Sequence, residues 1–105
     1  MRFVETPAFT AGTRRLLSDD SYRALQVSLL LRPEQGRLIP GGRGLRKVRW
    51  AVPGKGKRGG LRIIYYWARS RDAIYMLYAY GKQVQGDLTP AQLKMLIQAV
   101  QEEFR

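Results

Sequence analysis

Basic side chains between Arg43 and Arg62 are interleaved with residues that favour β-strands, and this pattern strongly constrains the fold. Strand-forming residues flank a glycine-rich stretch on both sides, at 48–52 and 63–67. The segment has no acidic residue, and its eight basic residues are Arg43, Arg46, Lys47, Arg49, Lys55, Lys57, Arg58 and Arg62. A basic run built into strands forms a fixed surface, and a fixed basic surface suits RNA binding or phosphate chemistry.

The runs 45–52 and 61–68 are predicted to form a hairpin joined by the stretch PGKGKRGG. Alternation along the first strand directs Lys47 and Arg49 to one face and Arg46 to the other. In a simple hairpin register, Arg62 joins Lys47 and Arg49 on their face. The basic side chains of the loop then hang over the open end of the hairpin: Lys55, Lys57 and Arg58.

The remaining segments predict a single α+β domain over residues 1–105. We expect strands at 2–6 and 73–80 and helices at 9–17 and 19–31, the second capped by Ser18. A third helix begins after Thr89, because T-P-A-Q has the form of a capping box with proline at the first helical position. The order β-α-α-β-β-β-α suggests an antiparallel sheet with the helices packed on one face.

The charge balance points to a polyanionic partner. The net charge is +11, and arginine, which binds phosphate with two parallel donors, outnumbers lysine fourteen to five. The sequence contains no cysteine or histidine and no close pairing of carboxylates, so we expect no zinc site and no two-metal nuclease chemistry. No apolar run approaches the about 20 residues of a membrane span, so we expect a cytoplasmic protein without a membrane partner.

Several motifs allow a structural as well as a functional interpretation. The basic face is compatible with a solvent-exposed sheet surface that has no partner. Repulsion among eight cations without an acidic residue makes such a surface unfavourable. The glycine-rich loop is not a nucleotide-binding P-loop, because a strand follows it instead of a helix. We interpret Tyr78 and the run 65–67 as packing residues, whereas Tyr80, beside Lys82, is equally suited to packing and to base stacking or proton transfer.

Cleavage of RNA without histidine or metal needs another source of catalysis. The 2′-hydroxyl must lose a proton, the pentavalent phosphate must be stabilised and the leaving oxygen must be protonated. A cluster of cations stabilises the phosphate directly, and a lysine beside other cations can transfer protons. A basic cluster is therefore a candidate catalytic apparatus as well as a binding surface.

The stretch GLRKVRWAVPGKGKRGGLRIIYYW, followed by IYMLYAYGK and an amphipathic helix, resembles the RelE/HigB family of bacterial type II toxins, and most of all its HigB-type branch. The resemblance spans residues 44–82 and, in outline, nearly the whole chain. It implies a RelE-like α+β fold and a ribosome-dependent mRNA interferase that cuts mRNA in the A site of the 70S ribosome. It also implies a neutralising antitoxin, commonly with a helix-turn-helix domain, through which operator DNA is bound indirectly, and no metal or cofactor.

The resemblance also implies roles for individual residues. Arg62 matches the arginine that contacts the scissile phosphate, and Lys47 and Arg49 match the paired basic residues of the preceding strand. The pattern departs from RelE at Gln83 and Thr89, where an arginine and a tyrosine are lost. The full set of predicted catalytic residues is Arg62, Lys47, Arg49, Lys57, Tyr80 and Lys82, with Tyr80 and Lys82 replacing the lost pair. The predicted RNA-binding residues are Arg43, Arg46, Lys55 and Arg58.

Two other functions are compatible with the same sequence. One is an RNA-binding module that uses the basic surface for affinity alone and leaves RNA intact. The other is a catalytically inactive protein of the same fold that retains antitoxin binding. Cleavage of RNA and growth arrest on expression separate the toxin from both alternatives.

Overall fold

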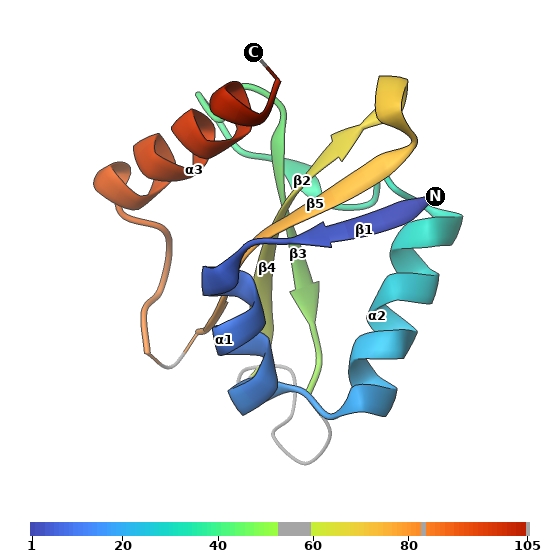
Figure 1. Cartoon of the computed structure of the whole chain (residues 1–105). Helices are drawn as coiled ribbons and strands as arrows, with labels where there is room; N and C mark the ends of the chain where they lie inside the picture. The colour runs from blue at the N-terminus through green and yellow to red at the C-terminus, as the bar shows by residue number, and fades with distance from the viewer. Residues whose placement is uncertain (53–59, 83, 105) are drawn as a thin grey trace.

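The computed structural model describes residues 1–52, 60–82 and 84–104, and within them a mixed five-stranded sheet is combined with three α-helices (Figure 1). The sheet order is β1-β5-β4-β3-β2. The predicted α+β class is therefore confirmed. In chain order the elements are β1 (Arg2–Glu5), α1 (Pro7–Leu16), α2 (Asp19–Leu31), β2 (Arg37–Leu38), β3 (Leu45–Trp50), β4 (Leu61–Ala68), a 3-10 turn (Arg69–Arg71), β5 (Ala73–Gly81) and α3 (Pro90–Glu103).

Two features of the sheet differ from the prediction. First, β1 pairs with β5 in parallel, so the sheet is mixed and not antiparallel. Second, the segment expected to be a loop contains the short strand β2, which pairs antiparallel with β3. Two residues of strand carry too little periodicity to be recognised in a sequence.

Helices cover both faces of the sheet, and the prediction that all of them pack on one face is wrong. Helices α1 and α2 bury Phe9 and Leu25 against Ile63 on one face. Helix α3 packs Leu93 and its other apolar residues on the opposite face, against the strand residues Leu45 and Ile64. Strands β4 and β5 are buried along nearly their whole length, which requires cover on both sides. Within the described residues, no helix has the length and apolar content needed to cross a membrane.

Each helix begins at a side-chain cap. Thr6 and Ser18 accept hydrogen bonds from the backbone N–H groups of Phe9 and Ser21, both at 3.1 Å. Thr89 accepts from the Gln92 backbone N–H at 3.1 Å, and Gln92 Oε1 accepts from the Thr89 N–H at 3.0 Å. This confirms the predicted capping box. Helix α1 begins two residues earlier than predicted, because Thr6 is its cap and proline follows.

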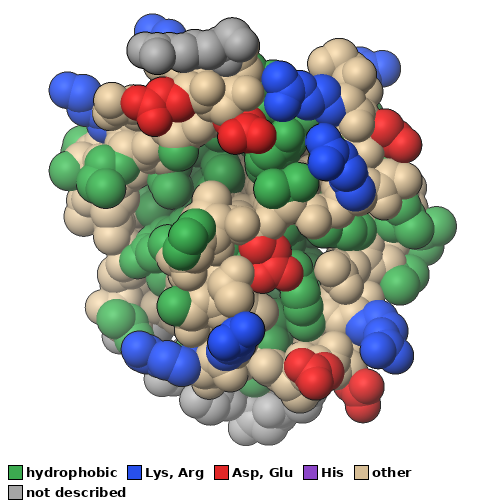
Figure 2. Space-filling view, viewed as in Figure 1, with side chains coloured by type: hydrophobic (Ala, Val, Ile, Leu, Met, Phe, Trp, Pro, Cys, Tyr) green, Lys and Arg blue, Asp and Glu red, His purple; other side chains and the backbone are tan. Residues whose placement is uncertain are grey.

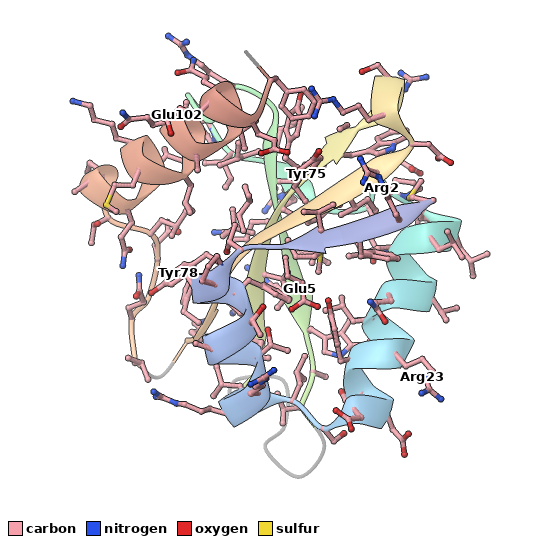
Figure 3. All side chains as sticks on the ribbon, viewed as in Figure 1. Arg2, Glu5, Arg23, Tyr75, Tyr78 and Glu102 are labelled. Carbon is pink, nitrogen blue, oxygen red and sulfur yellow. The ribbon has the colours of Figure 1, made fainter. Side chains whose placement is uncertain are left out.

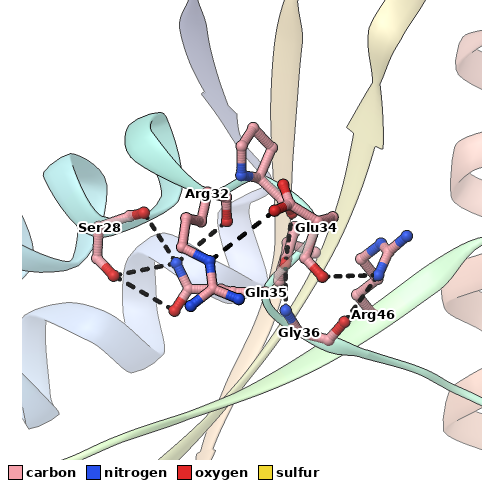
Figure 4. Close-up of polar contacts among 8 residues, drawn as sticks. Ser28, Arg32, Glu34, Gln35, Gly36 and Arg46 are labelled. Carbon is pink, nitrogen blue, oxygen red and sulfur yellow. Dashed lines mark hydrogen bonds and ion pairs between the residues drawn. The ribbon is translucent and has the colours of Figure 1, made fainter.

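Hydrogen bonds hold the connection from α2 to β2 against the sheet (Figure 4). Tyr65, fully buried on β4, donates its hydroxyl to the Pro33 carbonyl at 2.7 Å and accepts from the Gly36 N–H at 2.9 Å. A Cβ at Gly36 would meet the Tyr65 ring at 2.8 Å, so only glycine allows this approach. Arg46 Nη1 donates to the carbonyls of Glu34 and Gly36, at 2.9 and 2.8 Å. These contacts fix where β2 begins.

Three tyrosines are predicted to resist ionisation in the folded protein. Burial raises the pKa of Tyr22, Tyr65 and Tyr80, and the Glu5 carboxylate, which accepts from the Tyr22 hydroxyl at 2.6 Å, adds to the effect at Tyr22. Unfolded tyrosines ionise near pH ~10. The unfolded chain therefore releases these protons first, and stability should be lost as pH rises above ~10. Titrating the phenolate absorbance of native and urea-unfolded protein checks this. Coincident curves would contradict it.

Candidate functional site

Two arginines and a tyrosine lie side by side across three strands. In the sheet register Arg49 is opposite Arg62, and Arg62 is opposite Tyr80. Directly opposed residues project from the same face, with Cβ atoms about 5 Å apart. The predicted hairpin face is therefore present. It brings residues far apart in the chain into one row.

A parallel row lies one step farther from the hairpin loop. Lys47 is opposite Ile64, and Ile64 is opposite Tyr78. Lys47 shares the face of Arg49 and Arg62, as predicted. Its Nζ lies 3.3 Å from Asp87 Oδ1, in the connection between β5 and α3. A hollow of about 350 Å³ adjoins this ion pair and is lined by Arg37, Leu38, Ile39, Pro40, Lys47 and Asp87.

The site has an exposed layer and a buried layer. Arg49 is exposed, and the Lys47 side chain is 27% exposed. Arg62 and Tyr80, at 5% and 3%, are buried. The expectation that Arg62 is an exposed side chain is therefore wrong. Because the central strand β4 is flanked by β3 and β5 and covered on both faces, a residue opposite Tyr80 is enclosed even at the end of the strand.

Arg62 and Tyr80 are buried with few partners. The guanidinium of Arg62 donates to the Leu61 carbonyl at 3.4 Å, and no described carboxylate lies within ion-pair distance of it. The Tyr80 hydroxyl has no hydrogen-bond partner among the described residues. Buried polar groups normally find partners, so burying Arg62 with one long hydrogen bond is costly unless an anion completes it.

The Tyr80 hydroxyl remains protonated at neutral pH. Burial raises its pKa above the ordinary value near 10, and the negative charge of Asp87 adds to the shift. The positive charge of Arg62 acts in the opposite direction. A neutral phenol beside a guanidinium is suited to donate a hydrogen bond or a proton to an anionic group.

Asp87 is a member of the site that the sequence analysis missed. Its Oδ1 accepts from the Leu88 backbone N–H at 2.8 Å as well as from Lys47. Both contacts hold the pKa of the Asp87 carboxyl below its ordinary range, with the backbone contact contributing most. A carboxylate of such low basicity is a weak proton acceptor at neutral pH and serves better to orient Lys47. No spacing motif links Asp87 to Lys47, so only the fold reveals the pair.

Replacing Asp87 with asparagine should raise the affinity for single-stranded RNA about two-fold, because one negative charge leaves the site while the acceptor for Leu88 stays. The free energy of unfolding should change by less than about 0.5 kcal/mol, since the pair is exposed. Fluorescence anisotropy with a labelled oligonucleotide measures the affinity. The matched control is Asp72→Asn, whose carboxylate is 76% exposed against 73% for Asp87 and pairs with the N-terminus. An equal change in both variants would contradict the placement of Asp87 in the RNA site.

The other predicted site residues are more dispersed. Lys82 is exposed just after β5, and its backbone N–H donates to the Gly60 carbonyl at 3.3 Å. Arg43 is exposed in the turn before β3. Arg46 lies on the opposite face of β3, where it binds the carbonyls described above, and its RNA contact stays a prediction. Lys55, Lys57 and Arg58, and also Gln83, lie outside the described residues.

Tyr78 has the packing role expected of it. Its hydroxyl lies 3.4 Å from Gln85 Oε1 and 3.5 Å from Gln92 Nε2, and its ring lies 5.8 Å from that of Tyr80. Figure 3 places Tyr78 near the start of α1, at the edge of the sheet. Tyr65 is fully buried, and Tyr66 and Trp67 pack against the two cores, as expected for the aromatic run.

The chain matches no model of a known protein family. Among the described residues, no group of three or more histidine, cysteine, aspartate or glutamate side chains is placed to hold a metal ion. The side of the molecule in Figure 2, where β1, α1 and α2 lie, mixes basic and acidic side chains with hydrophobic ones between them.

Proposed function

We propose that this protein is an mRNA interferase of the RelE/HigB type, a metal-independent endoribonuclease that cuts mRNA in the ribosomal A site and inhibits translation. One observation carries the proposal. The register of β3, β4 and β5 brings Arg49, Arg62 and Tyr80 together beside Lys47, on a chain of net charge +11. This set supplies both a phosphate site and a proton donor.

In the proposed reaction the RNA supplies its own nucleophile. The 2′-oxygen forms a bond to the adjacent phosphorus as its proton leaves, and the bond from phosphorus to the 5′-oxygen breaks as that oxygen gains a proton. Arg62 stabilises the charge of the pentavalent phosphate, and Arg49, Lys47 and Lys57 bind phosphate. The amine of Lys47 or Lys57 accepts the proton that leaves the 2′-oxygen. Tyr80, protonated at neutral pH, donates to the leaving 5′-oxygen, with Lys82 at the rim.

The burial of Arg62 sets a condition on this mechanism. At 5% exposure it has no open route to a phosphate, so direct contact requires that the covering residues move aside. Lys47 and Arg49, which are more accessible, then make the first contact with RNA. A buried cation that pairs with no described carboxylate lies behind them and strengthens the field that attracts the phosphate.

The ribosome, the A site and the antitoxin enter the proposal through the resemblance of residues 44–82 to the RelE/HigB family. The cognate antitoxin would neutralise the protein and, through a helix-turn-helix domain, bring it to operator DNA. The α+β fold is compatible with the RelE-like topology. Residue-level support comes from the basic face of β3 and β4 and from Tyr80 of β5.

The second candidate is a catalytically inactive RNA- or antitoxin-binding protein of the same fold. The buried state of Arg62 and of the Tyr80 hydroxyl favours it, because a site that stays closed binds RNA only through its exposed cations. The two candidates differ in whether RNA is cut.

The deciding experiment incubates the purified protein with an mRNA, with and without ribosomes, and maps the ends by primer extension. The proposal expects cuts only with ribosomes and within the A-site codon. An mRNA with a 2′-deoxy nucleotide at the cut site should stay intact there. Intact RNA in every lane, from folded protein, would overturn the proposal in favour of the binding protein.

A further inference from the structure

The hollow beside Lys47 has two neighbouring hollows. On one side it shares Arg37 and Lys47 with a second hollow of about 350 Å³ that reaches Arg49. A third hollow of about 600 Å³ is lined by Gly41, the neighbour in sequence of Pro40, and by residues of α3. We name these three neighbouring hollows the groove; their lining residues come from β3, the β2–β3 turn and α3.

The charge along the groove is strongly positive. Five cations line its three hollows against a single carboxylate, that of Asp87. Arg43 and Lys94 stand at the far end, and neither forms an ion pair with a described carboxylate. The five cations are Arg37, Arg43, Lys47, Arg49 and Lys94.

Apolar side chains alternate with these cations. Leu38 is 60% exposed beside Arg37, and Leu93 and Ile97 of α3 are half-buried in the wall of the third hollow. Gln98 and Gln101 add amide groups to the same wall. Cations of this kind can follow a phosphate backbone, and the aliphatic side chains beside them offer apolar contact to bases, although the lining of these hollows has no aromatic ring.

The backbone at Arg43 supports a binding role at the end of the groove. Arg43 has φ 53°, the left-handed region that side chains other than glycine seldom adopt, and it lies between two glycines. This conformation places an exposed arginine on the rim of the third hollow. Strained residues of this kind concentrate at functional sites.

We infer that a single-stranded RNA segment flanking the cut lies in this groove and extends from Lys47 to Arg43 and Lys94. The inference rests on the proposed function for the identity of the polyanion. It adds Arg37, Leu38 and Lys94 to the RNA-binding surface, none of which the sequence singled out. RNA is favoured over an acidic protein because two of the hollows are lined by Lys47 and Arg49 of the phosphate site, and the cations of the groove have apolar surface beside them.

The test measures binding without cleavage. Fluorescence anisotropy measures the affinity for labelled 2′-O-methyl oligonucleotides of about 4 and about 10 nucleotides at several salt concentrations. The blocked 2′-oxygens of these oligonucleotides prevent cutting. The double variant Arg43→Gln/Lys94→Gln should lose most of the gain in affinity from the longer oligonucleotide. Its slope of log affinity against log salt should fall by about 1.4, for two lost phosphate contacts. The matched control is Arg14→Gln/Arg23→Gln, two exposed arginines of α1 and α2.

Each outcome decides between the two proposals. A double variant that binds like the control overturns the groove, and a wild-type protein that still cuts mRNA then keeps the proposed function. If the double variant loses the length-dependent binding and the wild-type protein never cuts mRNA, the groove is supported and the proposed nuclease function is wrong. If the double variant loses affinity for a labelled polyglutamate peptide and none for RNA, the occupant is an acidic protein and the RNA inference is wrong.

Discussion

Replacing Arg62 with glutamine should lower the rate of mRNA cleavage by about 10²–10³-fold, the usual effect of removing one transition-state contact to a developing charge. The fold should survive, and the melting temperature should stay the same or rise. The reason is that a buried guanidinium without a described carboxylate partner destabilises the folded state. Single-turnover cleavage on programmed ribosomes measures the rate, and thermal unfolding measures the stability.

The control for Arg62 is Arg23→Gln, which removes the same charge from an exposed position on α2 (Figure 3). Its cleavage rate should be that of the wild type. Arg62→Lys keeps a charge but loses the fork that binds two phosphate oxygens, so its rate should fall between the other two. Equal rates for Arg62→Gln and Arg23→Gln, in folded proteins, would remove Arg62 from the mechanism.

Replacing Tyr65 with phenylalanine should lower the free energy of unfolding by about 2 kcal/mol, because the Gly36 N–H and the Pro33 carbonyl both lose their buried partner. The ring itself still fits, so the loss belongs to the hydroxyl alone. The midpoint of urea unfolding, with an unchanged slope, measures the change. The connection before β2 should also loosen, which hydrogen exchange at Gly36 detects.

Tyr66→Phe is the matched control. Tyr66 is the next residue on β4, half-buried with its ring 5.7 Å from Phe104, and its hydroxyl makes no hydrogen bond to a described residue. Its removal should cost less than about 0.5 kcal/mol. If both variants lose the same stability, the hydrogen bonds of Tyr65 do not hold the connection.

Local features of the chain were predictable because they depend on neighbours in sequence. The bounds of α2 and β4 agree with the prediction, and so does the Thr89–Gln92 capping box. The common face of Lys47, Arg49 and Arg62 was also predictable, since a hairpin and strand alternation suffice to bring them together. The strand β2 and the parallel β1–β5 pairing were not, because neither has a periodic signal in the chain.

The apolar runs of β4 and β5 contained a signal for two-sided cover. Residues 61–65 and 73–77 are buried without interruption, whereas a strand with one wet face alternates. Reading these runs as strands buried on both faces would have predicted helices on both sides of the sheet. The prediction of one covered face treated them as ordinary alternating strands.

By itself the sequence determined the positions of the helix caps, the strands of the basic hairpin and the clustering of cations along it, because these follow from residues a few positions apart. The tertiary structure alone decided that Arg62 is buried against Tyr80, that Asp87 pairs with Lys47, and that the β2–β3 turn and α3 enclose a basic groove. These features join residues that are far apart in the chain; Lys47 and Asp87, for example, are 40 positions apart. Their contacts depend on how whole helices and strands pack, and local propensity does not encode that packing.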